Sequence, residues 1–195
     1  MVDSSEPLEL LALDETFDHA YGARLIARAV VSPDQECIPA TPRFAVEVVP
    51  VRGERWRAIF CGEPVDEYID RLLTTPAPDT LCVIAGGHGY FVQATDRYAW
   101  EQVECTPIRQ ALGIPDQGLL VFGDFIQLVA YEHDPTSIDT AVKMRWRSAR
   151  LGWDRLEVLG VAAGILHGRA WHARDDRMVG FTVDLDTGLH EGGAY

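Results

Sequence analysis

A cluster of basic residues stands out in an otherwise acidic chain: Lys143, Arg145 and Arg147. Alternate residues of a β-strand point to the same side, so an extended conformation predicts these three cations on one face of a strand. Arginine forks bind carboxylate and phosphate oxygens, which makes the stripe a candidate anion-binding site. Two structural interpretations compete with it. One is a solvated edge strand whose cations discourage sheet-to-sheet pairing, and the other is a set of ion pairs with the acidic segment 63–70. We favour the edge strand.

Two aromatic side chains extend the set of candidate binding residues. His167 and Trp171 are four positions apart, so both lie on one face of a strand and could line a pocket if that face is open. His88 lies in the run Gly86-Gly87-His88-Gly89, which is similar to a phosphate-binding loop. Such loops precede a helix, whereas the residues that follow here have the composition of a strand. We therefore predict a hairpin turn with positive φ angles and an exposed His88 at its tip.

Motifs for metal, nucleophilic and cofactor chemistry are absent from the sequence. The six histidines include no HExxH pattern, and the four cysteines form no CxxC pair. The nearest histidine pair, His167 and His172, has an odd separation that places its members on opposite faces of a strand. No serine stands in G-x-S-x-G. We predict no catalytic residue, metal ligand or cofactor, although an active site assembled from distant carboxylates or histidines remains open.

Charge and hydropathy limit the classes of partner. The chain has 17 basic and 30 acidic residues, a formal net charge of −13 that disfavours nucleic-acid binding and permits a basic protein partner. No apolar run has the length of a membrane span, and residues 1–23 carry six acids and no Lys or Arg, unlike a secretory signal. The expected location is the cytoplasm, with reduced cysteines.

A repeat in the second half predicts the fold. Apolar runs begin at Leu81, Leu119 and Leu156, which are 38 and 37 residues apart. Each run is followed by a small-residue turn, a second apolar run, an acidic turn and an aromatic residue, the pattern of short antiparallel strands. The chain is therefore expected to be a mainly β, single domain over 1–195, an antiparallel sandwich or twisted meander of repeated units with an irregular N-terminal segment, 1–20. Propeller-like units are the alternative.

Two helices and one hairpin complete the predicted elements. An amphipathic helix is expected over 64–73, because Val65, Tyr68, Ile69, Leu72 and Leu73 form an apolar stripe and Glu63, Asp66, Glu67 and Asp70 another face. A shorter helix is expected over 107–113. Residues 44–51 alternate as a strand with one more polar face, and 56–61 are expected to return beside it as a hairpin.

The composition and motifs favour a recognition function. The leading hypothesis is a soluble, non-catalytic domain whose acidic surface binds a protein partner. The alternative is a small-molecule or anion-binding protein that uses the Lys143–Arg147 stripe or a pocket near His167 and Trp171. An enzyme with an assembled site is the third hypothesis. The sequence does not determine the oligomeric state.

The absence of ligand motifs yields a first prediction. Purified protein should contain no stoichiometric transition metal, and a chelator should leave its melting temperature unchanged. A tightly held ion stabilises the native state by mass action, so its removal would lower that temperature. Elemental analysis that finds about one zinc or iron per chain would contradict the prediction.

Overall fold

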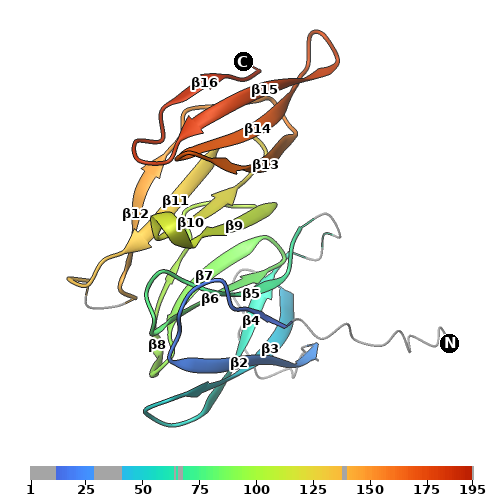
Figure 1. Cartoon of the computed structure of the whole chain (residues 1–195). Helices are drawn as coiled ribbons and strands as arrows, with labels where there is room; N and C mark the ends of the chain where they lie inside the picture. The colour runs from blue at the N-terminus through green and yellow to red at the C-terminus, as the bar shows by residue number, and fades with distance from the viewer. Residues whose placement is uncertain (1–11, 29–40, 64, 66–67, 138–139, 195) are drawn as a thin grey trace, which may run out of the picture.

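The computed structural model describes residues 12–28, 41–63, 65, 68–137 and 140–194, and these form sixteen strands and one short 3-10 helix, Pro115–Gln117. The strands belong to four sheets that lie one above another (Figure 1). No helix of the described residues is long and apolar enough to cross a membrane.

Each sheet is built largely from neighbouring segments of the chain. The first sheet has the order β2-β3-β4, with β2 Tyr21–Arg28, β3 Thr41–Pro50 and β4 Trp56–Gly62. The second is β1-β5-β6-β7-β8, with β1 Leu13–Asp14, β5 Arg71–Thr74, β6 Thr80–Ala85, β7 His88–Gln93 and β8 Asp96–Gln102. The third is β12-β11-β10-β9, with β9 Gln110–Ile114, β10 Leu119–Gly123, β11 Leu128–His133 and β12 Val142–Arg147. The fourth is β13-β14-β15-β16, with β13 Leu156–Ala162, β14 Ile165–His172, β15 Arg177–Asp184 and β16 His190–Gly192.

Three hydrophobic cores join successive sheets. Val46 and Trp56 of the first sheet pack with Leu81 and Val83 of the second. The other side of the second sheet packs on the third, where the Phe91 ring meets the Tyr131 ring edge-on with centroids 4.9 Å apart. The third and fourth sheets share a core that includes Leu128, Trp146, Leu166 and Phe181. The two middle sheets are thus covered on both faces, which explains why every residue of β6 and β10 is buried.

The predicted repeat is confirmed as a mainly β, antiparallel architecture. Its three units are the consecutive antiparallel strands β6-β7-β8, β10-β11-β12 and β13-β14-β15, each in a different sheet. The predicted hairpin of 44–51 with 56–61 is also confirmed as β3 and β4. The predicted turn at Gly86 and Gly87 is confirmed too. It connects β6 to β7, and the two glycines have positive φ angles of 52° and 78°.

The amphipathic helix expected over 64–73 is wrong. Pro64, Asp66 and Glu67 lie outside the described residues, but the second half of the segment is β5, which pairs with β1 and β6. Leu72 packs in the core between the first and second sheets, and Leu73 packs in the core on the other side. Adjacent buried residues in a doubly covered strand reproduced part of a helical pattern. The expected water-facing Asp70 instead accepts hydrogen bonds from Arg43 Nε at 2.9 Å and from the Gly86 amide at 2.6 Å.

The shorter helix expected over 107–113 is wrong as well. Gln110–Ile114 forms β9, which pairs antiparallel with β10. The segment is therefore an edge strand of the third sheet. Pairing with β10 satisfies its main-chain groups in a way that the local sequence pattern did not reveal.

Close packing between β14 and β15 yields a second prediction. A Cβ atom added at Gly168 would lie 2.7 Å from Phe181 Cε2 and 2.8 Å from the Glu157 carbonyl oxygen, and closer still to Phe181 Cζ. We expect Gly168→Ala to lower the free energy of unfolding by about 1–3 kcal/mol, the range for overpacked cores. The matched control is Gly180→Ala, where the new Cβ meets only a carbonyl oxygen at 3.9 Å. Urea denaturation that shows equal losses for both variants would contradict the packing of this sheet.

Candidate functional site

The basic stripe lies on β12, at the edge of the third sheet, as the edge-strand interpretation predicts. Each of its cations has an acidic partner. Lys143 Nζ lies 3.6 Å from a Glu132 oxygen, and Arg145 bonds to the same carboxylate at 3.0 Å and to Asp186 at 3.0 Å. Arg147 Nη2 lies 3.2 Å from Glu104 Oε2 and also donates to the Glu104 carbonyl at 2.8 Å. Among the described residues, none of these partners belongs to segment 63–70, which one interpretation named.

A β-bulge changes the expected common face of these cations. The register between β11 and β12 shifts between Ala130 and Tyr131, so strict alternation is broken at this point. Met144 consequently packs in the core between the second and third sheets, whereas Trp146 packs in the core between the third and fourth. Arg145 reaches Asp186 beside the fourth sheet, and Arg147 reaches Glu104 after β8 of the second. The stripe is therefore divided between two sides of its sheet.

His167 and Trp171 share the outer face of β14, as their spacing predicts. They lie opposite Thr182 and Met178 of β15, and the exposed Arg169 stands between them in the strand. Arg169 Nε donates to Glu157 at 2.6 Å. The predicted exposed position of His88 at the tip of the turn is wrong, because His88 pairs with Ala85 at the start of β7 and is partly buried. The candidate binding residues predicted from the sequence are thus distributed over three sheets.

The pairing of β14 with β15 also places His167 and His172 where they cannot hold one metal ion together. His172 lies opposite Arg177, five positions along β14 from His167 and on the other face of the sheet. Within the described residues, no group of three or more His, Cys, Asp or Glu side chains is placed to hold a metal ion. Burial raises the pKa of the Cys105 thiol to about 12, so this thiol is protonated at neutral pH.

A different feature of the second sheet is exposed: its edge strand, β8. Six of its seven residues are solvent-exposed, and the seventh, Ala99, is partly exposed. The Tyr98 side chain is 76% exposed and Trp100 is 55% exposed. Since β8 is the last strand of its sheet, its outer main-chain groups pair with no strand of the described residues. A long exposed edge with large aromatic side chains is unusual for a surface that contacts only water.

The exposed aromatic residues of β8 are held in place by their neighbours. The Trp100 ring meets the Tyr90 ring edge-on with centroids 6.0 Å apart, and Tyr90 in turn contacts the Phe60 ring of β4 at 5.6 Å. An aromatic row thus runs from the core to the surface. Arg97 places its guanidinium 4.8 Å from the centroid of the Tyr98 ring and donates to the Tyr98 hydroxyl at 2.7 Å.

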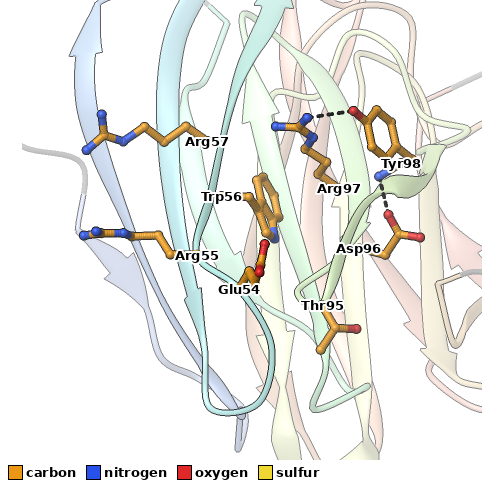
Figure 2. A pocket seen from close by; sticks show the side chains of 8 residues that line it. All are labelled: Glu54, Arg55, Trp56, Arg57, Thr95, Asp96, Arg97 and Tyr98. Atoms are coloured by element: carbon orange, nitrogen blue, oxygen red, sulfur yellow. Dashed lines mark hydrogen bonds between the residues drawn. The ribbon is translucent and has the colours of Figure 1, made fainter.

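A cleft of about 660 Å³ lies beside the start of β8, between residues 54–57 and 95–98 (Figure 2). The Trp56 indole spans the junction and donates to the Ala94 carbonyl at 2.7 Å, which joins the two sheets here. Figure 2 shows Arg97 and Tyr98 on one side of the cleft, while Arg55 and Arg57 extend away from it on the far side of β4. The cleft is therefore not a convergent arginine pocket.

Arg55 and Arg57 instead belong to a cluster on the outer face of the first sheet. The Glu47 side chain is only 1% exposed, although it lies on this open face. Arg24 donates to Glu47 Oε2 through Nε at 2.8 Å and Nη2 at 2.5 Å, and Arg57 donates to Oε1 through Nε at 2.9 Å and Nη2 at 2.8 Å. Arg55 Nη1 lies 3.8 Å from Oε1. These hydrogen bonds hold the pKa of Glu47 below its ordinary value, and those from Arg57 have a larger effect than those from Arg24.

The sequence contained a signal for this cluster that the motif search missed. The predicted hairpin places Glu47 on the polar face of residues 44–51, and β3 and β4 pair so that Arg57 lies directly opposite it. Arg24 of β2 lies opposite Glu47 on the other side. The contribution of β2 was not predictable, because the apolar run at residues 23–31 of the sequence fits either a helix or a strand.

Comparison with models of protein families and with curated proteins finds no match to this chain.

The pKa of Glu47 yields a third prediction. A carboxyl group whose folded-state pKa is lowered stabilises the fold above its ordinary pKa of 4.5, and this contribution is lost as the pH falls below that value. We expect Glu47→Gln to be less stable than wild type at neutral pH and the difference to shrink on acidification. Glu157→Gln, which removes the same charge from a more exposed single pair with Arg169, is the control. The free energy of unfolding is measured by chemical denaturation from neutral pH to below 4.5. A difference between wild type and Glu47→Gln that stays constant with pH would contradict the prediction.

Proposed function

We propose that this chain is a non-catalytic recognition domain that binds a protein partner through β8. The observation that carries the proposal is a sheet edge that pairs with no strand of the described residues and that exposes Arg97, Tyr98 and Trp100. Tryptophan, tyrosine and arginine are the residue types most enriched among the side chains that dominate binding energy at protein interfaces. The four sheets are proposed to act together as the single domain that supports this edge.

The unpaired edge supports binding by strand addition. An extended segment of a partner can pair with the outer main-chain groups of an edge strand, while alternate side chains provide specificity. The register of β8 against β7 shifts between Val92 and Gln93, which pair with Trp100 and Asp96, so the exposed Tyr98 lies in a bulged part of the strand. Regular pairing with β7 covers Trp100–Gln102, and the exposed rings of Trp100 and Tyr98 would give an added strand apolar contacts there and beside the bulge.

The order already present in β8 lowers the cost of binding. Trp100 rests on Tyr90, and Arg97 is fixed against the Tyr98 ring and hydroxyl. Immobilising a flexible side chain costs about 0.5–1.5 kcal/mol on association, so side chains that are ordered beforehand retain more of their contact energy.

The charges around β8 indicate the chemistry of the partner. Asp96 and Glu101 are exposed in the strand, and Glu54 lines the adjacent cleft. Together with the net charge of −13, these carboxylates would steer a basic partner and repel an acidic one. The proposed partner segment is therefore extended and carries Lys or Arg.

Selection from a random peptide library displayed on phage tests this function as a fourth prediction. Selected peptides should be enriched in Lys and Arg, bind the wild type saturably, and protect β8 amides from hydrogen exchange. Trp100→Ala should weaken binding by roughly tenfold or more, since central interface residues contribute 2 kcal/mol or more. Methylation of alternate backbone nitrogens in the peptide should also weaken binding, because strand addition needs those donors.

Trp153→Ala is the matched control, since Trp153 is 51% exposed and has Arg150 over its ring at 4.6 Å but lies outside β8. This variant should bind the peptides as the wild type does. Peptides whose affinity falls equally in both variants, or whose exchange footprint lies outside residues 96–102, would overturn the proposal.

A further inference from the structure

The first sheet presents a surplus of positive charge on its outer face. We call Arg24, Arg55, Arg57 and Glu47 the arginine cluster. Three guanidinium charges surround one carboxylate, which leaves two positive charges in excess. Among the described residues, Glu47 is the one acidic side chain that forms an ion pair with any of these arginines. This contrasts with Lys143, Arg145 and Arg147, which are paired with Asp134, Asp186 and Glu104 respectively, while Glu132 also contacts the first two.

The guanidinium groups are accessible although the carboxylate is not. The side chains of Arg24, Arg55 and Arg57 are 69%, 63% and 64% exposed, against 1% for Glu47. The arginines therefore cover the carboxylate and form the surface themselves. A second anion that approaches this face meets the cations before it meets the buried negative charge.

Glu47 also orients two of the arginines. In Arg24 and Arg57 the bonds to Glu47 use the Nε and Nη2 side of the guanidinium. A guanidinium has five N–H donors in a fixed plane, so the Nη1 groups and one hydrogen of Nη2 remain to bond elsewhere. Because the Glu47 carboxylate holds both guanidinium groups beforehand, a ligand would not have to meet the full entropic cost of ordering them.

The adjacent sheet surface leaves room for a ligand. Gly22 precedes Arg24 by two positions in β2 and lies opposite Val49, and a Cβ atom added at Gly22 would meet no atom within 4 Å. Figure 2 shows Arg55 and Arg57 extending together from the side of β4 opposite Trp56. A small group can therefore approach the sheet beside the cluster without displacing the core.

We propose that the arginine cluster binds a phosphate monoester dianion. Two excess positive charges match the charge of the dianion, and the phosphate oxygens can accept hydrogen bonds from several guanidinium groups at once. A monocarboxylate offers one negative charge and is satisfied by one arginine fork, so it should bind more weakly. The phosphate group can be carried by a small molecule or by a phosphorylated side chain, which present the same chemistry to the cluster.

Titration monitored by arginine side-chain NMR signals tests the proposal, as a fifth prediction. Inorganic phosphate, glycerol phosphate and a phosphoserine peptide are added at constant ionic strength, with acetate and the unphosphorylated peptide as controls. Phosphate compounds should bind saturably and shift the Nε signals of the cluster. Binding should weaken as the pH falls from 7.5 to 5, because the second phosphate pKa is about 6. Tighter binding of the peptide than of glycerol phosphate identifies a phosphorylated side chain as the source, and the reverse identifies a small molecule.

Substitutions separate a specific site from general charge attraction. Arg55→Gln should weaken phosphate binding roughly tenfold, as expected for a charge-assisted hydrogen bond. This arginine makes no close hydrogen bond with Glu47, so its loss should leave the fold unchanged. Arg57→Gln should also weaken binding, and Arg169→Gln, which removes an exposed arginine of the fourth sheet, should not. Non-saturable shifts, equal binding of acetate, or equal losses in Arg55→Gln and Arg169→Gln would overturn the proposal. Trp100→Ala should leave phosphate binding intact, so this result is independent of the proposed protein partner.

Discussion

Apolar contact between successive sheets is the interaction on which the rest of the structure depends. A sheet with an apolar face must bury it, and in this chain each sheet does so against the next one. The second sheet shows the consequence most clearly, because Leu81 and Val83 enter one core while Cys82 and Ile84 enter another. Stacking uses both faces of the middle sheets. The surfaces left for contact with other molecules are the sheet edges and the outer faces of the first and last sheets.

How far the fold could be predicted depended on which pattern each strand carried. The turn at Gly86 and Gly87 was predictable, because a two-residue hairpin with positive φ requires residues of this kind. The strand β5 was not, because Leu72 and Leu73 are buried on opposite sides and therefore show no alternation. Continuous burial in a doubly covered strand removes the period of two that distinguishes a strand from a helix.

The candidate site was less predictable, since a sequence shows charges but not their partners. The stripe at 143–147 looked like a concentration of free cations, yet Glu132 and Asp186 arrive from elsewhere in the chain to pair with it. Glu47 looked like one acid among many, yet three arginines meet around it once β2 and β4 flank β3. Long-range strand pairing decides in both cases which charges are neutralised and which remain in excess.

The two proposed binding surfaces follow from the same geometry but use different parts of a sheet. At β8 the main chain itself is available, so the natural ligand is another extended chain, with Trp100 and Tyr98 adding apolar contact. On the outer face of the first sheet the main-chain bonds of β3 are taken by β2 and β4, so only side chains can bind. There the Glu47 carboxylate orients Arg24 and Arg57 and neutralises one positive charge, and the remaining positive charge faces solvent. An edge thus favours a peptide, whereas a closed face with ordered arginines favours a compact anion.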